Sequence, residues 1–146
     1  MAIPFVMQQR VEFCETDAAG IAHFTAFFRY MERAEHELLR QLGFSVVWHD
    51  EQGTISWPRV SVTCDYTGAV RFEDLLDVAV HVERLGERSI TYRFEMTHQS
   101  RPVAKGKITA VCCRVAPGRP LESLAIPDWV RERLQPYVLT SASATG

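Results

Sequence analysis

An acidic residue stands directly before the part of the chain that the sequence predicts to be its longest helix. Asp17 lies in a loop of small residues. The apolar residues that follow recur every three or four positions, as on the buried stripe of a helix. They are Phe24, Phe27, Phe28, Met31, Ala34, Leu38 and Leu42. The first turn of a helix carries unpaired N–H groups and the positive end of the helix dipole, which stabilise a developing negative charge. The pattern therefore pairs a carboxylate with a site for an oxyanion.

Each of these features also has a purely structural interpretation. An Asp before a helix commonly caps the helix or stabilises a turn. Phe27, Phe28 and Met31 are explained as core residues, although core residues beside a gap also line ligand pockets. The residue types and their spacing leave both interpretations open.

The elements that must position these residues are short strands with alternating apolar and polar positions, a period typical of half-buried strands. Short turns between them, around Gly86 and at 100–102, indicate antiparallel neighbours. Lys105, Gly106 and Lys107 interrupt the last run, at a bulge or where another group approaches the backbone. The predicted strands cover residues 7–14, 58–66, 76–83, 90–97 and 103–115.

One strand, one long helix and four further strands predict an α+β fold. The five antiparallel strands offer one large apolar face, and the helix starting near Phe24 is the element large enough to cover it. The uncovered edges of the sheet predict self-association. Residues 1–138 are expected to form a single domain, with a short helix at 127–134. The tail, 139–146, is expected to be disordered.

Composition excludes several classes of function. The chain has 146 residues, and its formal net charge of −2 does not favour nucleic acid or an anionic membrane as a partner. We find no apolar run long enough for a membrane span and no secretory signal, so we expect a cytoplasmic protein. The four cysteines and five histidines lack the spacing of metal ligands or a disulfide framework. We therefore expect no metal and no cofactor.

The order of elements and two motifs carry a resemblance to a known family. The motifs are Asp17-x-x-Gly20-Ile21 and the aromatic run Phe24-x-x-Phe27-Phe28-x-Tyr30-Met31-Glu32. Together they resemble the hot-dog-fold acyl-CoA thioesterases, in particular the 4-hydroxybenzoyl-CoA thioesterase type, which includes the enzymes linked to the bacterial Tol-Pal cluster. The similarity covers roughly residues 6–115. The resemblance implies a five-stranded antiparallel sheet wrapped around one long central helix.

The resemblance also implies a role for the matching positions. Asp17 aligns with the catalytic carboxylate, Gly20 keeps the loop tight, and the backbone N–H of Phe24 aligns with the oxyanion donor. Around these we expect substrate contacts and, near the Gly86 turn, contacts to the phosphates of coenzyme A. The substrate-binding candidates are His23, Phe27, Phe28, Glu32 and Thr63. The CoA-binding candidates are Arg84, Arg88 and Ser89.

The activity implied is hydrolysis of an aromatic or a short or medium acyl-CoA, by a homodimer or homotetramer whose active sites span the subunit boundary. Asp17 would act as nucleophile or as general base, and the sequence does not separate the two routes. Many members carry Asn or Ser where this chain has Thr25-Ala26, so the acyl group stays open. Two alternatives remain: a non-catalytic acyl-CoA-binding protein, and a hot-dog hydratase or dehydratase that uses Asp17 with His23.

Overall fold

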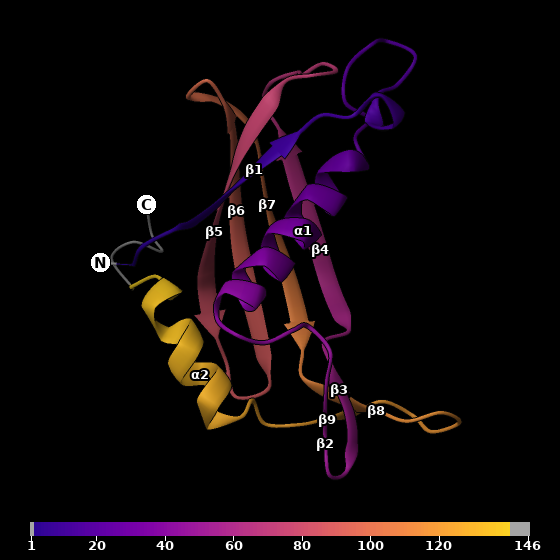
Figure 1. Ribbon diagram of the computed structural model, residues 1–146, viewed down its shortest axis with the longest axis vertical. Helices are drawn as coiled ribbons and strands as arrows, with labels where there is room; N and C mark the ends of the chain where they lie inside the picture. The colour runs from indigo at the N-terminus through magenta and orange to yellow at the C-terminus, as the bar shows by residue number, and fades with distance from the viewer. Residues whose placement is uncertain (1, 141–146) are drawn as a thin grey trace.

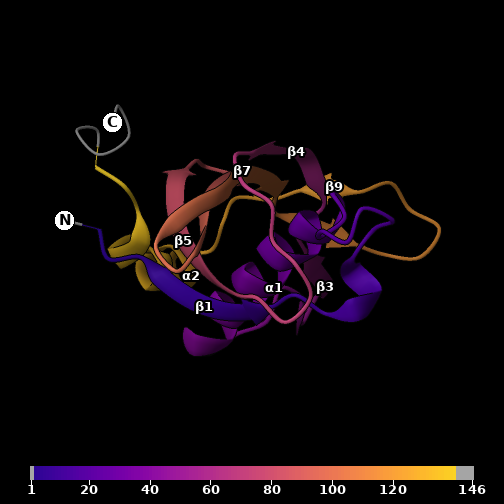
Figure 2. The same ribbon diagram turned by 90° about the horizontal axis from the view of Figure 1, so that it is seen from above.

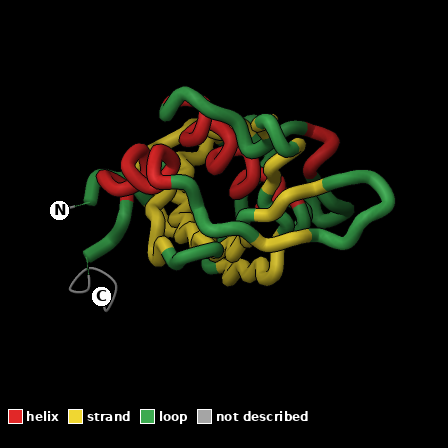
Figure 3. The backbone as a smooth tube through the Cα atoms, turned by 90° about the horizontal axis from the view of Figure 1, so that it is seen from below, coloured by secondary structure: helices red, strands yellow, loops and turns green. Residues whose placement is uncertain are grey.

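The main layer of the molecule is a five-stranded antiparallel sheet that curves around a single long helix (Figures 1 and 2). The computed structural model describes residues 2–140. The helix, α1 (Ala26–Gln41), lies across one face of the sheet, and Figure 3 shows this layering from the opposite end. The predicted α+β architecture is thereby confirmed. The strand order is β1 (Phe5–Arg10), β5 (Leu75–Leu85), β6 (Ser89–His98), β7 (Arg101–Val111) and β4 (Arg59–Tyr66).

The first strand ends earlier than the alternation predicts. β1 stops at Arg10, and the chain continues into a 3-10 helix, Phe13–Glu15. The change of direction is stabilised locally, because the carboxylate of Glu15 accepts the backbone N–H of Glu12 at 2.9 Å. This short turn carries the chain from the sheet into the loop that contains Asp17.

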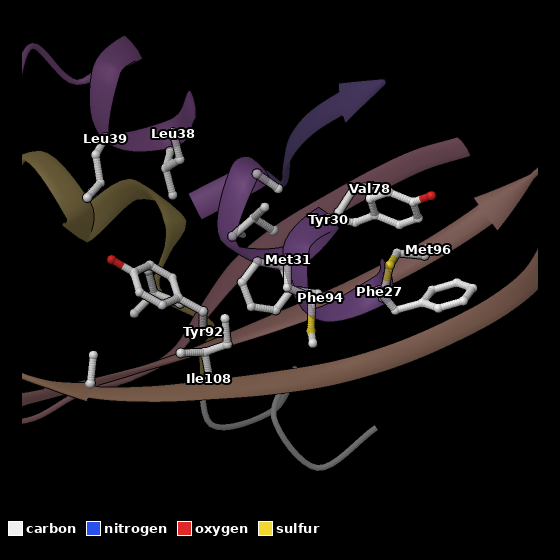
Figure 4. Packing of buried hydrophobic residues seen from close by; sticks show 14 of the residues in the cluster. Phe27, Tyr30, Met31, Leu38, Leu39, Val78, Tyr92, Phe94, Met96 and Ile108 are labelled. Carbon is white, nitrogen blue, oxygen red and sulfur yellow. The ribbon is translucent and has the colours of Figure 1, made fainter. Parts of the chain in front are cut away.

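The buried stripe of α1 largely matches the sequence pattern. Phe27 and Met31 are buried against the sheet, where they pack among residues of β6 and β7 such as Phe94 (Figure 4). Phe24 departs from the pattern, since it is 60% exposed and precedes the helix, which begins at Ala26. The predicted helix start is therefore two residues too early, and Phe24 belongs to the loop that leads into the helix.

β4 forms one edge of the sheet and stays partly uncovered. Its apolar positions share a face with buried residues of β7, since Val62 lies opposite Ile108 in the register. Even so, Val60, Val62 and Tyr66 are 63%, 39% and 44% exposed, because an edge strand has a neighbour on one side only. An exposed apolar edge is a surface for pairing with another chain.

Gly106 marks a close approach between the sheet and the helix. A Cβ at this position would lie 2.6 Å from Sδ of Met31 and 2.5 Å from the backbone oxygen of Thr63. The register between β4 and β7 runs through Gly106 without a shift. Of the two explanations offered by the sequence, the approach of another group is the correct one, and that group is Met31 of α1.

A second, smaller sheet was not predicted. The predicted strand 103–115 divides at Cys112, whose backbone N–H donates to the carbonyl of Arg88 at 2.8 Å. The chain then pairs with an earlier hairpin, and the predicted helix follows as α2 (Asp128–Leu134). The sheet order is β2 (Trp48–Asp50), β3 (Gly53–Ser56), β8 (Cys113–Val115) and β9 (Glu122–Ser123).

The C-terminal end of the described chain packs back on the main sheet. After α2 and a 3-10 turn, Gln135–Tyr137, the N–H of Leu139 donates to the carbonyl of Val82 at 2.8 Å. Most of the predicted disordered tail, residues 141–146, lies outside the described residues. No helix within residues 2–140 is long and apolar enough to cross a membrane.

Candidate active site

Asp17 sits at the base of a small closed loop between Thr16 and Ala22, which pair as an isolated β-bridge. Its backbone N–H donates to the carbonyl of Ile21 at 2.9 Å, and its own carbonyl accepts the N–H of Gly20 at 2.9 Å. Gly20 has a φ of +79°, a left-handed conformation that residues with a Cβ rarely adopt. The tight loop expected from the sequence is therefore present and depends on this glycine.

The side chain of Asp17 is only partly satisfied by its own loop. Oδ1 accepts the backbone N–H of Ala19 at 2.8 Å and that of Ile21 at 3.4 Å. Within residues 2–140, no hydrogen-bond donor reaches Oδ2. One oxygen stabilises the turn, as the structural interpretation expects, and the catalytic interpretation stays a prediction.

The two peptide groups around Phe24 are fixed at three of their four polar atoms. The carbonyl of His23 accepts the N–H of Ala26 at 2.9 Å, and the N–H of Thr25 donates to Nδ1 of His23 at 3.2 Å. The carbonyl of Phe24 accepts the hydroxyl of Tyr66 at 2.7 Å. The fourth group, the N–H of Phe24, has no acceptor among the described residues. It is an oriented, unused donor close to the start of α1.

An apolar cavity of about 380 Å³ is bordered by both Asp17 and Phe24. Phe27 forms an inner wall, and its ring meets the ring of Tyr66 edge-on with centroids 5.2 Å apart. Burial raises the pKa of Tyr66 to about 12, so its hydroxyl stays protonated and able to donate. The cavity is lined by Asp17, Ile21, Ala22, Phe24, Phe27, Tyr66, Gly68, Ala69 and Val70.

A second carboxylate anchors the Asp17 loop to the helix. Glu15 is 7% exposed, and its Oε1 accepts the hydroxyl of Tyr30 at 2.9 Å. Its Oε2 accepts the guanidinium of Arg33 at 3.2 Å, and its backbone carbonyl accepts the N–H of His23 at 2.7 Å. Burial and the neighbouring Glu15 both raise the pKa of Tyr30 well above its ordinary value. Glu15 thus ties both ends of the loop to α1.

The family is shown by a comparison with known proteins. Residues 11–134 match the model of the thioesterase-like superfamily. The chain belongs to this superfamily. Because the match spans most of the described chain, it includes the Asp17 loop, α1 and every strand of the main sheet except β1.

Relatives of this thioesterase are recognisable at low identity. This chain is 31% identical over 133 residues to a protein of Aquifex aeolicus that is provisionally named an esterase. The match covers 91% of this chain and 99% of the relative. The chain is 26% identical to the 4-hydroxybenzoyl-CoA thioesterase of a Pseudomonas species, over 66% of this chain and 70% of the relative.

A solved structure gives the same picture. A gentisyl-coenzyme A thioesterase superposes with a TM-score of 0.75 at 27% identity, covering 90% of this chain and 99% of the other. The fold is the hot-dog fold that the sequence predicted, with the small second sheet as an addition. By family and by fold, this thioesterase is a thioester hydrolase.

The structure brings some predicted site residues of the thioesterase together and separates others. Asp17, Phe24 and Phe27 border the cavity. His23 stacks on Phe24 with ring centroids 4.5 Å apart but lines a separate hollow of about 180 Å³. Phe28 is partly buried against the core. The contacts of these residues with a substrate stay predictions.

Two further candidates lie away from the cavity. Glu32 is on α1 with a side chain 55% exposed, 3.8 Å from Nη2 of Arg59. Thr63 pairs with Lys107 and lines a charged hollow on the face of the sheet opposite α1. Neither side chain lines the cavity beside Asp17 in its own chain.

The predicted CoA-binding residues lie at the other end of the sheet. Arg10, near the Asp17 loop, pairs with Leu75 at the start of β5, and β5 runs away from that point towards the Gly86 turn (Figure 1). Arg88 there donates to the backbone oxygen and to the hydroxyl of Ser123, both at 3.0 Å. Arg84 and Ser89 flank the same turn. Within a single chain these residues are remote from Asp17.

Two residues of the site were missed by sequence reasoning. Tyr66 was assigned to the apolar face of a strand, and nothing in the alternation points to a bond with Phe24, forty-two positions away. Glu15 lies in a loop without periodicity, and its burial results from contacts with Tyr30 and Arg33. The available signal was chemical: a charged residue next to a proposed site requires a partner if it is buried.

Proposed function

We propose that this thioesterase hydrolyses an acyl-CoA, with Asp17 as nucleophile or general base and the backbone N–H of Phe24 as the oxyanion donor. The observation that carries the proposal is that Asp17, whose Oδ2 accepts no hydrogen bond within residues 2–140, and Phe24, whose N–H has no acceptor there, border the same apolar cavity. The named acyl-CoA thioesterases among the relatives support an acyl-CoA as substrate.

The chemistry has two possible routes from this arrangement. In the first, Oδ2 of Asp17 attacks the thioester carbonyl, the tetrahedral oxyanion collapses and expels the CoA thiolate, and water then hydrolyses the mixed anhydride. In the second, Asp17 removes a proton from a water that attacks the carbonyl directly. Both routes place negative charge on the carbonyl oxygen, where the N–H of Phe24 would stabilise it. A thiolate leaves readily, so neither route needs a strong general acid.

The lining of the cavity favours an apolar acyl group. Phe24, Phe27 and Tyr66 present aromatic rings, and Val70 adds an aliphatic wall. Such a lining suits an aromatic acyl group or a short to medium aliphatic one. We further propose that the chain belongs to the 4-hydroxybenzoyl-CoA thioesterase type within the superfamily.

We also propose that the working enzyme is a homodimer, or a homotetramer built from two dimers, in the cytoplasm. The exposed apolar positions of β4 suit pairing with a second copy. A second copy would also offer a role to the residues that lie far from Asp17 in their own chain. We propose that Glu32, Thr63, Arg84, Arg88 and Ser89 act at the site of a neighbouring subunit.

The decisive experiment replaces Asp17 and follows the release of free thiol. With a panel of benzoyl-, phenylacyl- and fatty acyl-CoA substrates, Asp17→Ala and Asp17→Asn are expected to lower kcat by at least about 100-fold. Asp50→Asn, which removes a partly exposed carboxylate in the small second sheet, is the matched control and should retain activity. Near-normal turnover by Asp17→Ala would refute the mechanism.

The same assay separates the alternatives. Tight binding of acyl-CoA without thiol release by the unaltered protein would indicate a non-catalytic binding protein. A hydratase or dehydratase would change the acyl chain and leave the thioester intact. No observation favours the latter, since His23 bonds to Thr25 through Nδ1 and lines a different hollow from Asp17.

A further inference from the structure

Tyr66 connects the edge of the sheet to the loop that precedes the helix. It is the last residue of β4, and its hydroxyl donates to the backbone carbonyl of Phe24 at 2.7 Å. Its ring packs edge-on against Phe27 and lines the cavity beside Asp17. The side chain is thus held by packing at its ring, and its hydroxyl also has a hydrogen bond with the thiol of Cys64, two residues earlier on the same strand.

Tyr66 contacts Phe24, the residue whose N–H is the proposed oxyanion donor. The carbonyl of Phe24 is one of three bonded groups in the two peptides that surround it, and the other two bonds come from Ala26 and His23. Those two bonds are local, whereas Tyr66 reaches Phe24 from a different element. Without the hydroxyl, the peptide after Phe24 keeps only its local bond to His23 and gains freedom to rotate.

We propose that Tyr66 is a positioning residue for thioester hydrolysis, whose hydroxyl holds the backbone of Phe24 so that its N–H stays in the orientation an oxyanion requires. The inference rests on the proposed function, in which that N–H is the oxyanion donor. A preorganised donor contributes to catalysis because it does not reorient during the reaction. Small displacements of positioned groups carry large rate penalties. Tyr66 itself does not touch the reacting atoms in this role.

The test is Tyr66→Phe, which removes the hydroxyl and keeps the ring contact with Phe27. The expected result is a fall in kcat of about tenfold, in line with the loss of one neutral hydrogen bond, while KM changes by less than about twofold. The split between kcat and KM is the informative readout, because the lost orientation affects the transition state more than substrate binding. Because Tyr66 is 44% exposed, the variant is expected to fold.

A matched control removes another partly buried tyrosine hydroxyl far from the site. Tyr137→Phe, in the 3-10 turn after α2, should leave kcat and KM unchanged. A second measurement reports on the backbone directly: amide hydrogen exchange at Thr25, whose N–H shares a peptide with the carbonyl of Phe24 and donates to Nδ1 of His23, is expected to accelerate in Tyr66→Phe and not in Tyr137→Phe. Unchanged exchange at Thr25, followed by NMR, would count against the proposal.

The outcomes distinguish this inference from the proposed function. If Asp17→Asn is inactive and Tyr66→Phe retains normal kcat, the role of Tyr66 is refuted and the proposed function stands. A rise in KM at constant kcat would make Tyr66 a substrate contact and would equally refute the positioning role. If Asp17→Asn hydrolyses acyl-CoA normally, the proposed function fails first.

Discussion

The fold gives opposite environments to two carboxylates that lie two positions apart in the chain. Glu15 is buried, and three donors bind its side chain: the hydroxyl of Tyr30, the guanidinium of Arg33 and the N–H of Glu12. Asp17 is half-exposed and receives only backbone N–H groups of its own loop, at a single oxygen. The saturated carboxylate is suited to hold the loop in place, and the unsaturated one is suited to react.

The difference explains how the carboxylate proposed to react can lie in a rigid loop. A carboxylate surrounded by strong donors has its charge stabilised and is a poor base or nucleophile. Rigidity must therefore come from a neighbour, and Glu15 provides it by binding α1 through Tyr30 and Arg33. Stability and reactivity are thus separated onto two residues, which makes the separation open to test.

The largest effect on stability is expected at another saturated carboxylate. Glu35 is 1% exposed, and both of its oxygens bind the guanidinium of Arg59, with Nη1 2.9 Å from Oε2. Removing Arg59 would leave a buried charge whose one remaining ion-pair partner within residues 2–140 is His36, with Nε2 3.6 Å from Oε1. Arg59→Met is therefore expected to lower the free energy of unfolding at pH 8 by about 3–5 kcal/mol, measured by urea denaturation.

The pH dependence of that variant gives a sharper test. Burial already raises the pKa of Glu35, and loss of Arg59 would raise it further. A group with a raised folded-state pKa contributes stability below its unfolded pKa and loses it as pH rises through the folded value. The deficit of Arg59→Met should therefore shrink between pH 8 and pH 5. A deficit independent of pH would show that Glu35 is not the cause, and Arg59→Met combined with Glu35→Leu should recover part of the loss.

Next in size is the direct comparison between Glu15 and Asp17. Glu15→Ala removes a buried acceptor and leaves the hydroxyl of Tyr30 without its partner, so the free energy of unfolding should fall by about 2–3 kcal/mol. Asp17→Ala removes only an acceptor of its own turn and should cost less than about 1 kcal/mol. Urea denaturation of the two variants measures both quantities, and equal losses would contradict the division between holding and reacting.

A smaller effect is expected when only one donor to Glu15 is removed. Tyr30→Phe keeps the buried ring and leaves Oε1 of Glu15 bonded to the N–H of Glu12. The expected loss in the free energy of unfolding is about 1 kcal/mol. Tyr137→Phe serves as the control for removing a tyrosine hydroxyl. If Tyr30→Phe loses as much stability as Glu15→Ala, then Tyr30 alone accounts for the attachment of Glu15 to α1.

The smallest effect belongs to the exposed partner of the same cluster. The side chain of Arg33 is 47% exposed where it meets Glu15, so water and salt screen the pair. Arg33→Met should cost about 0.5 kcal/mol or less, and the difference should diminish further in 1 M salt. A larger, salt-independent loss of stability would mean that Arg33, like Tyr30, is essential for attaching Glu15 to α1.

The parts of the fold that sequence predicted are those with a local pattern. The period of α1 and the alternation in the strands depend on residues near one another in the chain. The small sheet was missed because it joins Thr54 to Val115, and no local pattern announces a pairing at that separation. The start of α1 was misplaced because Phe24 continues the apolar period although it lies in the loop.

The candidate site shows the same division between local sequence patterns and long-range contacts. Asp17, Gly20 and Phe24 could be proposed from the sequence because they lie within eight positions and match a motif. Tyr66 and Glu15 are defined by contacts to Phe24 and Tyr30 that exist only in the folded chain. A motif can name the residues that carry the chemistry, whereas the residues that hold them still are selected by the tertiary structure.

The far wall of the cavity comes from a segment that is independent of the reactive loop. Residues 68–70 follow β4, and a single backbone bond, from the N–H of Ala22 to the carbonyl of Val70 at 2.8 Å, joins this segment to the loop. Substitution of the exposed Ala69 would therefore alter the size of the chamber while the carboxylate and the amide keep their spacing. Such an enzyme can change the acyl group that it accepts, during evolution or in the laboratory, while the groups proposed to act on the thioester stay unchanged.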